Sequence, residues 1–126
     1  MGKVQELEEI EVYQLAVALA DLIWKTISSW RPFARDTIGK QMVRAADSIA
    51  ANIAESYGRY HYGEKINFLY YSRGSLYETR HWVRRSHARQ LISDTVLGDL
   101  MGRMRILAPK LNAYIGSKKR QRARYK

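Results

Sequence analysis

Residues 93–115 of the chain read SDTVLGDLMGRMRILAPKLNAYI, and this stretch is the strongest indication of an all-helical fold. Its apolar residues recur every three or four positions, which is the period of a helix with one buried face. The row consists of Leu97, Leu100 or Met101, Met104, Leu107 or Ala108, Leu111 and Ile115. Ser93 or Asp94 can cap the first turn, and Pro109 inside the row predicts a kink or a broken turn. The stretch therefore predicts a long amphipathic helix.

Three earlier stretches show the same helical period. The first, from about Leu7 to Ser28, carries two adjacent apolar rows, and the resulting face is broader than a surface helix needs. The rows are Val12, Leu15, Leu19 and Leu22, and then Ala16, Ala20, Ile23 and Ile27. We therefore expect this helix either to lie centrally or to contact another subunit.

The second stretch follows a breaker at Pro32, has Asp36 or Thr37 as its expected N-cap, and continues to about Tyr57. The third covers about 64–90. Its expected inward residues are Phe68, Tyr71, Ser75, Trp82 and Val83. No segment alternates with the period of a strand, and short connections join antiparallel neighbours. The predicted fold is all-α, an antiparallel up-down four-helix bundle over residues 1–116, followed by a basic tail, 117–126, without apolar periodicity and therefore expected to be disordered.

Composition excludes several classes of protein. A chain of 126 residues normally forms one domain, and the absence of Cys excludes disulfides, thiolate zinc sites and cysteine nucleophiles. The longest apolar stretch, 12–24, is shorter than the roughly 20 residues that span a bilayer. With no secretory signal at the N-terminus, these features predict a cytoplasmic protein.

Neither a catalytic site nor a metal site is predicted. His81 and His87 are six residues apart, whereas histidines that share a metal on one helix lie three or four apart. Glu78 and His81 form one Glu-x-x-His pair, but a di-iron bundle needs two such helices and two more glutamates. We expect no enzyme activity, no metal and no cofactor.

The charge points to a polyanionic partner. Twenty-two Lys and Arg against 12 Asp and Glu give a net charge of +10, and RNA or DNA would relieve the self-repulsion of such a charge. An anionic membrane surface is a less favoured partner, because the basic residues lie on helices already committed to a core.

Three groups of residues are candidates for nucleic-acid binding. One group is the basic tail, which could instead serve only to keep the protein soluble. Another is a face of the third helix that contains no acids, which could instead be an ordinary solvated face. Arg59 lies among Tyr57, Tyr60 and Tyr62, which either stack on unpaired bases or pack against helix ends. The tail and helix residues are Lys118, Lys119, Arg120, Arg122, Arg124 and Lys126, and Arg80, Arg84, Arg85 and Arg89.

A polar row lies beside the apolar row of the second helix and continues on the third. It comprises Ser48, Asn52 and Glu55, with Arg73, Ser75 and Glu78. Such residues form either a solvated face, a ligand site or a buried network that sets helix register. We favour the structural network over a ligand site.

Two blocks carry a resemblance to a known family. Residues 44–55, RAADSIAANIAE, with Gly58-Arg59, resemble the first signature of the small bacterial four helix bundle protein family. Residues 68–78 resemble its second block, with Phe68-Leu69, Arg73-Gly74-Ser75-Leu76 and Glu78. Ser56 stands where the family usually has Gly. The resemblance covers most of residues 7–115.

The resemblance implies a non-enzymatic protein assembled as a barrel-like homopentamer. The family includes proteins encoded in intervening sequences of large-subunit ribosomal RNA genes, and accessory variability determinants of diversity-generating retroelements. Members of the second group bind a reverse transcriptase and RNA. The basic excess favours a nucleic-acid-binding accessory of a reverse transcriptase. The alternative is an intervening-sequence protein that acts as a structural oligomer.

Overall fold

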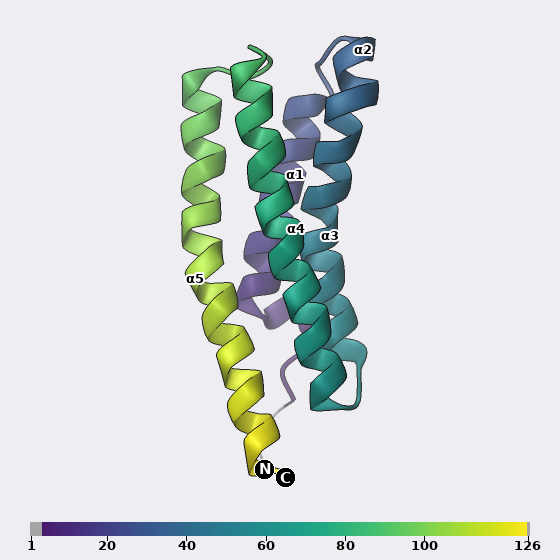
Figure 1. Ribbon diagram of the computed structural model, residues 1–126, viewed down its shortest axis with the longest axis vertical. Helices are drawn as coiled ribbons and strands as arrows, with labels where there is room; N and C mark the ends of the chain where they lie inside the picture. Colours follow the sequence, from purple (N-terminus) through teal and green to yellow (C-terminus); the bar gives the residue numbers. More distant parts are fainter. Residues whose placement is uncertain (1–3, 126) are drawn as a thin grey trace.

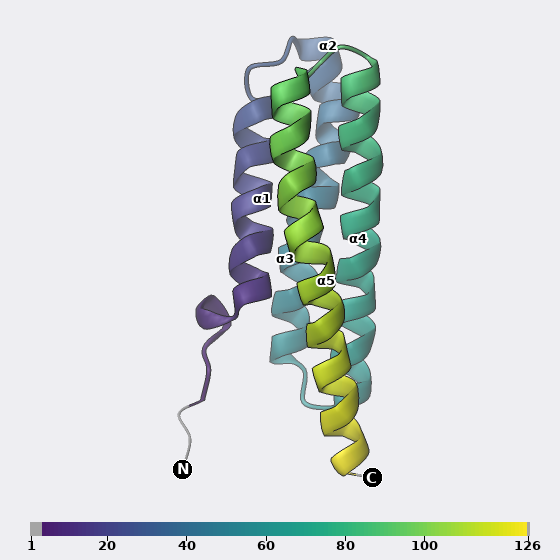
Figure 2. The same cartoon turned by 90° about the vertical axis from the view of Figure 1, so that its left-hand side faces the viewer.

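The structure, a computed structural model, describes residues 4–125, and all regular segments in that range are helical. The elements are a 3-10 turn η1 (Leu7–Glu9), α1 (Glu11–Ile27), α2 (Pro32–Ala34), a π-helical segment η2 (Arg35–Gly39), α3 (Lys40–Gly58), α4 (Tyr62–Ala88) and α5 (Asp94–Arg124). Both α1 and α4 pack against α3 and α5. Figures 1 and 2 show the four long helices running alternately up and down. The predicted antiparallel four-helix bundle is therefore confirmed.

The broad apolar face of α1 is mostly buried within the single chain. Six of the eight row residues are buried, and Leu15 and Leu22 are half-buried. The width of the face follows from the packing of α1 against two helices, α3 and α5. Most of the row is thus covered within one chain, and a contact with another subunit is not needed to explain it.

The second helix begins earlier than predicted. It starts at Pro32 and continues through η2 into α3, because proline at the first helical position loses no hydrogen bond that the helix could have made. Neither expected cap acts as one. The Thr37 hydroxyl donates to the Phe33 carbonyl at 2.6 Å, and Asp36 accepts a hydrogen bond from Arg35 at 3.0 Å.

The buried face of α4 differs from the predicted one. Of the five expected residues only Val83 is buried, and Tyr71 is 58% exposed. The observed face is Ile66, Leu69, Ser72, Leu76, Thr79, Val83 and Ser86. The Ser72 hydroxyl donates to the Ile49 carbonyl at 2.8 Å, which joins α4 to α3. The hydrophobic pattern missed this face because small hydroxyl residues, not aromatic ones, occupy the contact with α3.

The long helix at the C-terminus matches its prediction over its first part. The Ser93 hydroxyl caps α5 by accepting from the Val96 N–H at 3.2 Å, and the buried residues are Leu100, Met101, Met104, Leu107, Leu111 and Ile115. Pro109 lies inside the continuous helix. Figure 1 shows the lower part of α5 inclined to its upper part, which is consistent with a proline kink.

The predicted disorder of the tail is wrong for residues 117–124, which continue α5. Lys, Arg, Gln and Ala are strong helix formers, so this sequence extends a helix without needing an apolar row. The extension also contacts α4: the Lys119 ammonium lies 5.2 Å from the centre of the Tyr70 ring. Lys126 lies outside the described residues. Within them, no helix is long and apolar enough to cross a membrane.

Candidate nucleic-acid interface

The positive charge is concentrated in the second half of the chain. Residues 62–126 contain 15 Lys and Arg and four acids, a net charge of +11, whereas residues 1–61 contain seven bases and eight acids, a net charge of −1. Figure 2 shows α4 and α5, which the second half forms, side by side along the bundle. These two adjacent helices thus belong to the half of the chain that carries the excess charge, and we call their exposed surface the α4–α5 face.

Most cations on α4 and α5 have no carboxylate partner among residues 4–125. Of the 14 bases described after residue 61, only Arg103 and Lys110 form ion pairs, with Asp99 and Glu11. Of the six described before residue 62, three are paired, namely Arg35, Arg44 and Arg59. Exposed positive charges without partners repel one another, so binding of an external anion to this face would reduce the repulsion.

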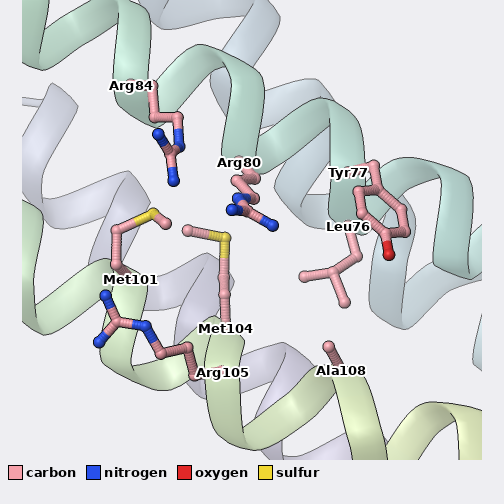
Figure 3. Close-up of a pocket in the computed structure, with 8 residues that line it drawn as sticks. All are labelled: Leu76, Tyr77, Arg80, Arg84, Met101, Met104, Arg105 and Ala108. Carbon is pink, nitrogen blue, oxygen red and sulfur yellow. The ribbon is translucent and has the colours of Figure 1, made fainter.

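Three guanidinium groups surround a hollow between α4 and α5 (Figure 3). Arg80 and Arg84 reach from α4, and Arg105 comes from α5. The floor of this cavity of about 260 Å³ consists of Leu76, Met101, Met104 and Ala108, and Tyr77 forms its rim. Apolar contacts to the arginine stems leave the charged ends toward solvent. Planar guanidinium groups suit the geometry of phosphate oxygens.

The structure divides the arginines that sequence reasoning grouped together. Arg80 and Arg84 share the hollow with Arg105, but Arg89 lies near Phe33 and Trp82, on the side of α2 and α3. Arg85 is exposed on α4 and forms no ion pair within the described range. Sequence reasoning missed Arg105, since its partners are more than twenty residues away and only helix packing brings them together.

Arg59 is already neutralised. It pairs with Glu55 at 3.4 Å and with Glu64 at 3.5 Å, and its guanidinium lies 4.7 Å from the centre of the Phe68 ring. The Tyr57 hydroxyl donates to the Gln5 carbonyl at 3.0 Å, so this tyrosine packs against the chain. Tyr60, in contrast, is 87% exposed.

The predicted tail cations lie along the last turns of α5. Lys118 is half-buried and donates to the Gln121 side chain at 3.3 Å. Burial lowers the pKa of Lys118, and the nearby Lys65 ammonium lowers it further. Lys119, Arg120, Arg122 and Arg124 are exposed and form no ion pairs within residues 4–125. These four extend the charge of the α4–α5 face to the lower end of the bundle.

The six residues of the expected polar network do not form one in the single chain. None is buried. Ser48 and Asn52 donate to carbonyls one turn earlier in α3, because serine and asparagine in helices readily bond to their own backbone. Arg73 donates to Asn112 at 3.2 Å. The remaining contacts are Glu55 with Arg59, Ser75 with Thr79, and Glu78 with Arg44 and Trp82.

The histidines bring no metal ligands together. His87 lies 2.6 Å from Asp94, and His81 packs edge-on against Trp82. Over residues 4–125, no group of three or more His, Cys, Asp or Glu side chains could hold a metal ion. The local chemistry of this face is therefore that of fixed cations and aromatic rings.

Comparison with known proteins agrees with the resemblance found in the sequence. The profile of the family described as 23S rRNA-intervening sequence protein matches residues 8–113. The solved structure of a protein of unknown function from the S23 ribosomal protein family of Bacteroides thetaiotaomicron VPI-5482 is similar in fold, with a TM-score of 0.74 and 20% identity, covering 82% of this chain and 97% of that one. No curated protein matches. The chain belongs to the 23S rRNA-intervening sequence protein family.

Proposed function

We propose that this protein binds nucleic acid along the α4–α5 face and acts as a non-enzymatic binding protein. The observation that carries the proposal is the hollow that Arg80, Arg84 and Arg105 line, with no carboxylate partner for these three among the described residues. The family description names a ribosomal RNA sequence, so RNA is the polyanion that we favour.

The dimensions of the face suit an extended strand. A helix of 27 residues, the length of α4, is ~40 Å long. The hollow lies on the upper part of this length, and the cations of the last α5 turns lie on the lower part. Such a track contacts the phosphate backbone at several points. Contacts of this kind give affinity without reading base sequence.

A salt titration tests the proposal. The protein is titrated with mixed-sequence RNA and DNA at increasing salt, alongside Arg80→Gln/Arg84→Gln/Arg105→Gln. Each lost phosphate contact should reduce the slope of log affinity against log salt by about 0.7 for single strands and about 0.9 for duplex DNA. A control with Lys25, Arg31 and Lys40 changed to Gln removes the same charge from the first half. The proposal would be contradicted if binding did not depend on salt, or if both variants lost the same affinity.

The family match favours an intervening-sequence protein over a reverse-transcriptase accessory. Its description names the ribosomal RNA intervening sequence, and no finding bears on a reverse transcriptase. That partner stays a prediction from the basic charge and the resemblance. The neighbouring genes would decide between the two branches, because a retroelement places template and variable repeats beside its accessory gene.

Self-association is a second part of the proposal and rests on the resemblance. Exposed Trp24 and Phe33 at the upper end of the bundle are apolar side chains that a neighbouring subunit could cover. Light scattering at micromolar concentration tests the expected homopentamer. A mass near the 14.7 kDa of one chain would contradict it.

A further inference from the structure

A second hollow lies at the lower end of the bundle, between the turn that joins α3 to α4 and the end of α5. Its volume is about 820 Å³, and its walls include Tyr60, Tyr62 and Tyr125. The α3–α4 turn and the end of α5 are far apart in the sequence, yet Figure 1 shows both at the lower end of the bundle. The hollow is therefore assembled only when α5 continues as a helix beyond residue 116.

The aromatic rings of this hollow form a platform. Tyr62 and Tyr125 are nearly parallel, with an angle of 10° between their planes and 5.9 Å between their centres. Tyr60 and Tyr125 are 87% and 78% exposed, so neither ring covers the core. Because Tyr62 and Tyr125 already stack on each other, an unpaired base can add to the exposed outer face of this pair.

Two cationic side chains, those of Arg122 and Lys65, line the same hollow as the tyrosines. The Arg122 guanidinium lies against Gly63 at the beginning of α4, where a methyl group at the glycine would sit 3.5 Å from Nη2. Lys65 is held by the end of α3, since its ammonium donates to the carbonyls of Ser56 at 3.3 Å and Tyr57 at 3.2 Å. The one carboxylate on the wall, Glu64, is occupied by Arg59 at 3.5 Å. Arg122 is therefore available to an anionic ligand, and the Lys65 ammonium, which has three N–H donors, keeps one of them for such a ligand.

We propose that this hollow binds one unpaired nucleotide of an RNA strand. The base stacks on the outer face of the Tyr62–Tyr125 pair, and Arg122 and Lys65 contact the adjacent phosphate. The Asn67 amide lies on the same wall, where it can donate to or accept from a base edge. The inference rests on the proposed function, because the α4–α5 cations hold the flanking strand. A duplex keeps its base faces stacked within the helix, so this site favours single strands.

The first test compares single-stranded and duplex RNA of equal length and mixed sequence by fluorescence anisotropy. Tyr62→Leu/Tyr125→Leu should weaken single-strand binding by about fivefold or more and change duplex binding by less than about twofold. Tyr71→Leu, which removes an exposed tyrosine from the middle of α4, is the matched control and should change neither. Equal losses on both RNAs, or no loss on single strands, would overturn the inference.

The second test uses adenosine 5′-monophosphate, which is too short to need the α4–α5 track. In a nuclear magnetic resonance titration, it should shift the ring signals of Tyr62 and Tyr125, whereas inorganic phosphate should not. If these signals move but RNA fails to bind, the nucleotide site stands and the proposed function fails. If RNA binds but adenosine monophosphate leaves these signals unchanged, the α4–α5 track stands and the nucleotide site fails.

Discussion

The two halves of the chain share one hydrophobic core but present different surfaces to solvent. In residues 1–61, bases and acids are nearly equal in number, and half of the described bases are ion-paired. In residues 62–126, bases outnumber acids by 11, and only two of the described bases are paired. Both halves fold into helices of the same bundle, so the charge is not required by the fold. Uncompensated charge of this kind costs stability unless a partner neutralises it.

The interiors of the halves also differ. Helix α3 buries one hydroxyl residue, Ser56, among its apolar residues, while α4 buries three, Ser72, Thr79 and Ser86. Every buried side-chain polar atom in the described range has a hydrogen-bond partner. The hydroxyl residues therefore belong to a satisfied, closely packed contact between α3 and α4. The second half is thus more polar both inside and outside.

The largest expected effect comes from neutralising the α5 end. Lys119→Gln/Arg120→Gln/Arg124→Gln removes three cations but leaves the aromatic hollow intact. If each binds one phosphate, single-strand affinity near 0.1 M salt should fall on the order of 100-fold, with a slope about 2 units shallower. Substitution is preferable to truncation, because residues 117–124 are helical. The control variant with Lys25, Arg31 and Lys40 changed to Gln should lose little affinity for single strands. A similar loss of affinity in that control would contradict the proposed difference between the two halves.

RNA should stabilise the protein through the second half alone. At about 100 times the dissociation constant, a ligand that binds only the folded state adds ~2.7 kcal/mol to the free energy of unfolding. Thermal denaturation followed by circular dichroism measures this. In the Arg80→Gln/Arg84→Gln/Arg105→Gln variant, the same RNA concentration should raise the free energy of unfolding by less. If RNA raises it equally in the variant and the wild type, RNA does not bind at this hollow.

The tight contact between α4 and α3 predicts a clear effect on stability. Ser72→Leu places a larger side chain where the Ser72 hydroxyl contacts the Ile49 carbonyl, and it should lower the free energy of unfolding by ~1–3 kcal/mol. Ser75→Leu, one turn away and only half-buried, should change it by less than about 0.5 kcal/mol. Urea denaturation compares the two. Equal effects would mean that α3 and α4 are not closely packed at Ser72.

The smallest expected effect concerns Lys118. Burial and Lys65 lower the pKa of Lys118 in the folded state, so its charge opposes folding at neutral pH. Lys118→Met should therefore slightly raise the free energy of unfolding. The difference in the free energy of unfolding between Lys118→Met and the wild type should become smaller as the pH rises toward the ordinary lysine pKa of 10.5. Over this range Lys118 loses its proton in the folded wild type before it does so in the unfolded chain. A difference that grows with pH would contradict this sign.

Much of the fold was predictable from the period of the apolar residues. The α5 row from Leu100 to Ile115 is buried as expected, and the Ser93 cap is in place. The predictions for α4 failed because Tyr71 and Phe68 suit an apolar row in sequence, whereas the buried face combines aliphatic residues with Ser72, Thr79 and Ser86. The predicted polar network does not form within the single chain, where Ser48 and Asn52 donate to carbonyls of their own helix.

The candidate site was predictable only in part. Arg80, Arg84 and the cations of 117–124 were identified from charge and the absence of acids. Arg105 and the pairing of Tyr62 with Tyr125 could not be found that way, because the residues concerned lie on different helices. Arg89 was grouped with Arg80 by helical spacing, although it lies on the side of α2 and α3.

The four helices, their antiparallel order, the family and the excess of positive charge follow from the sequence alone, since they depend on local periodicity, short connections and composition. The packing of the helices was needed to show which arginines line one hollow, which hydroxyls are buried, and that residues 117–124 are helical and lie beside α4. These features depend on contacts between residues far apart in the chain, and such contacts arise from the packing of one helix against another rather than from the pattern within either.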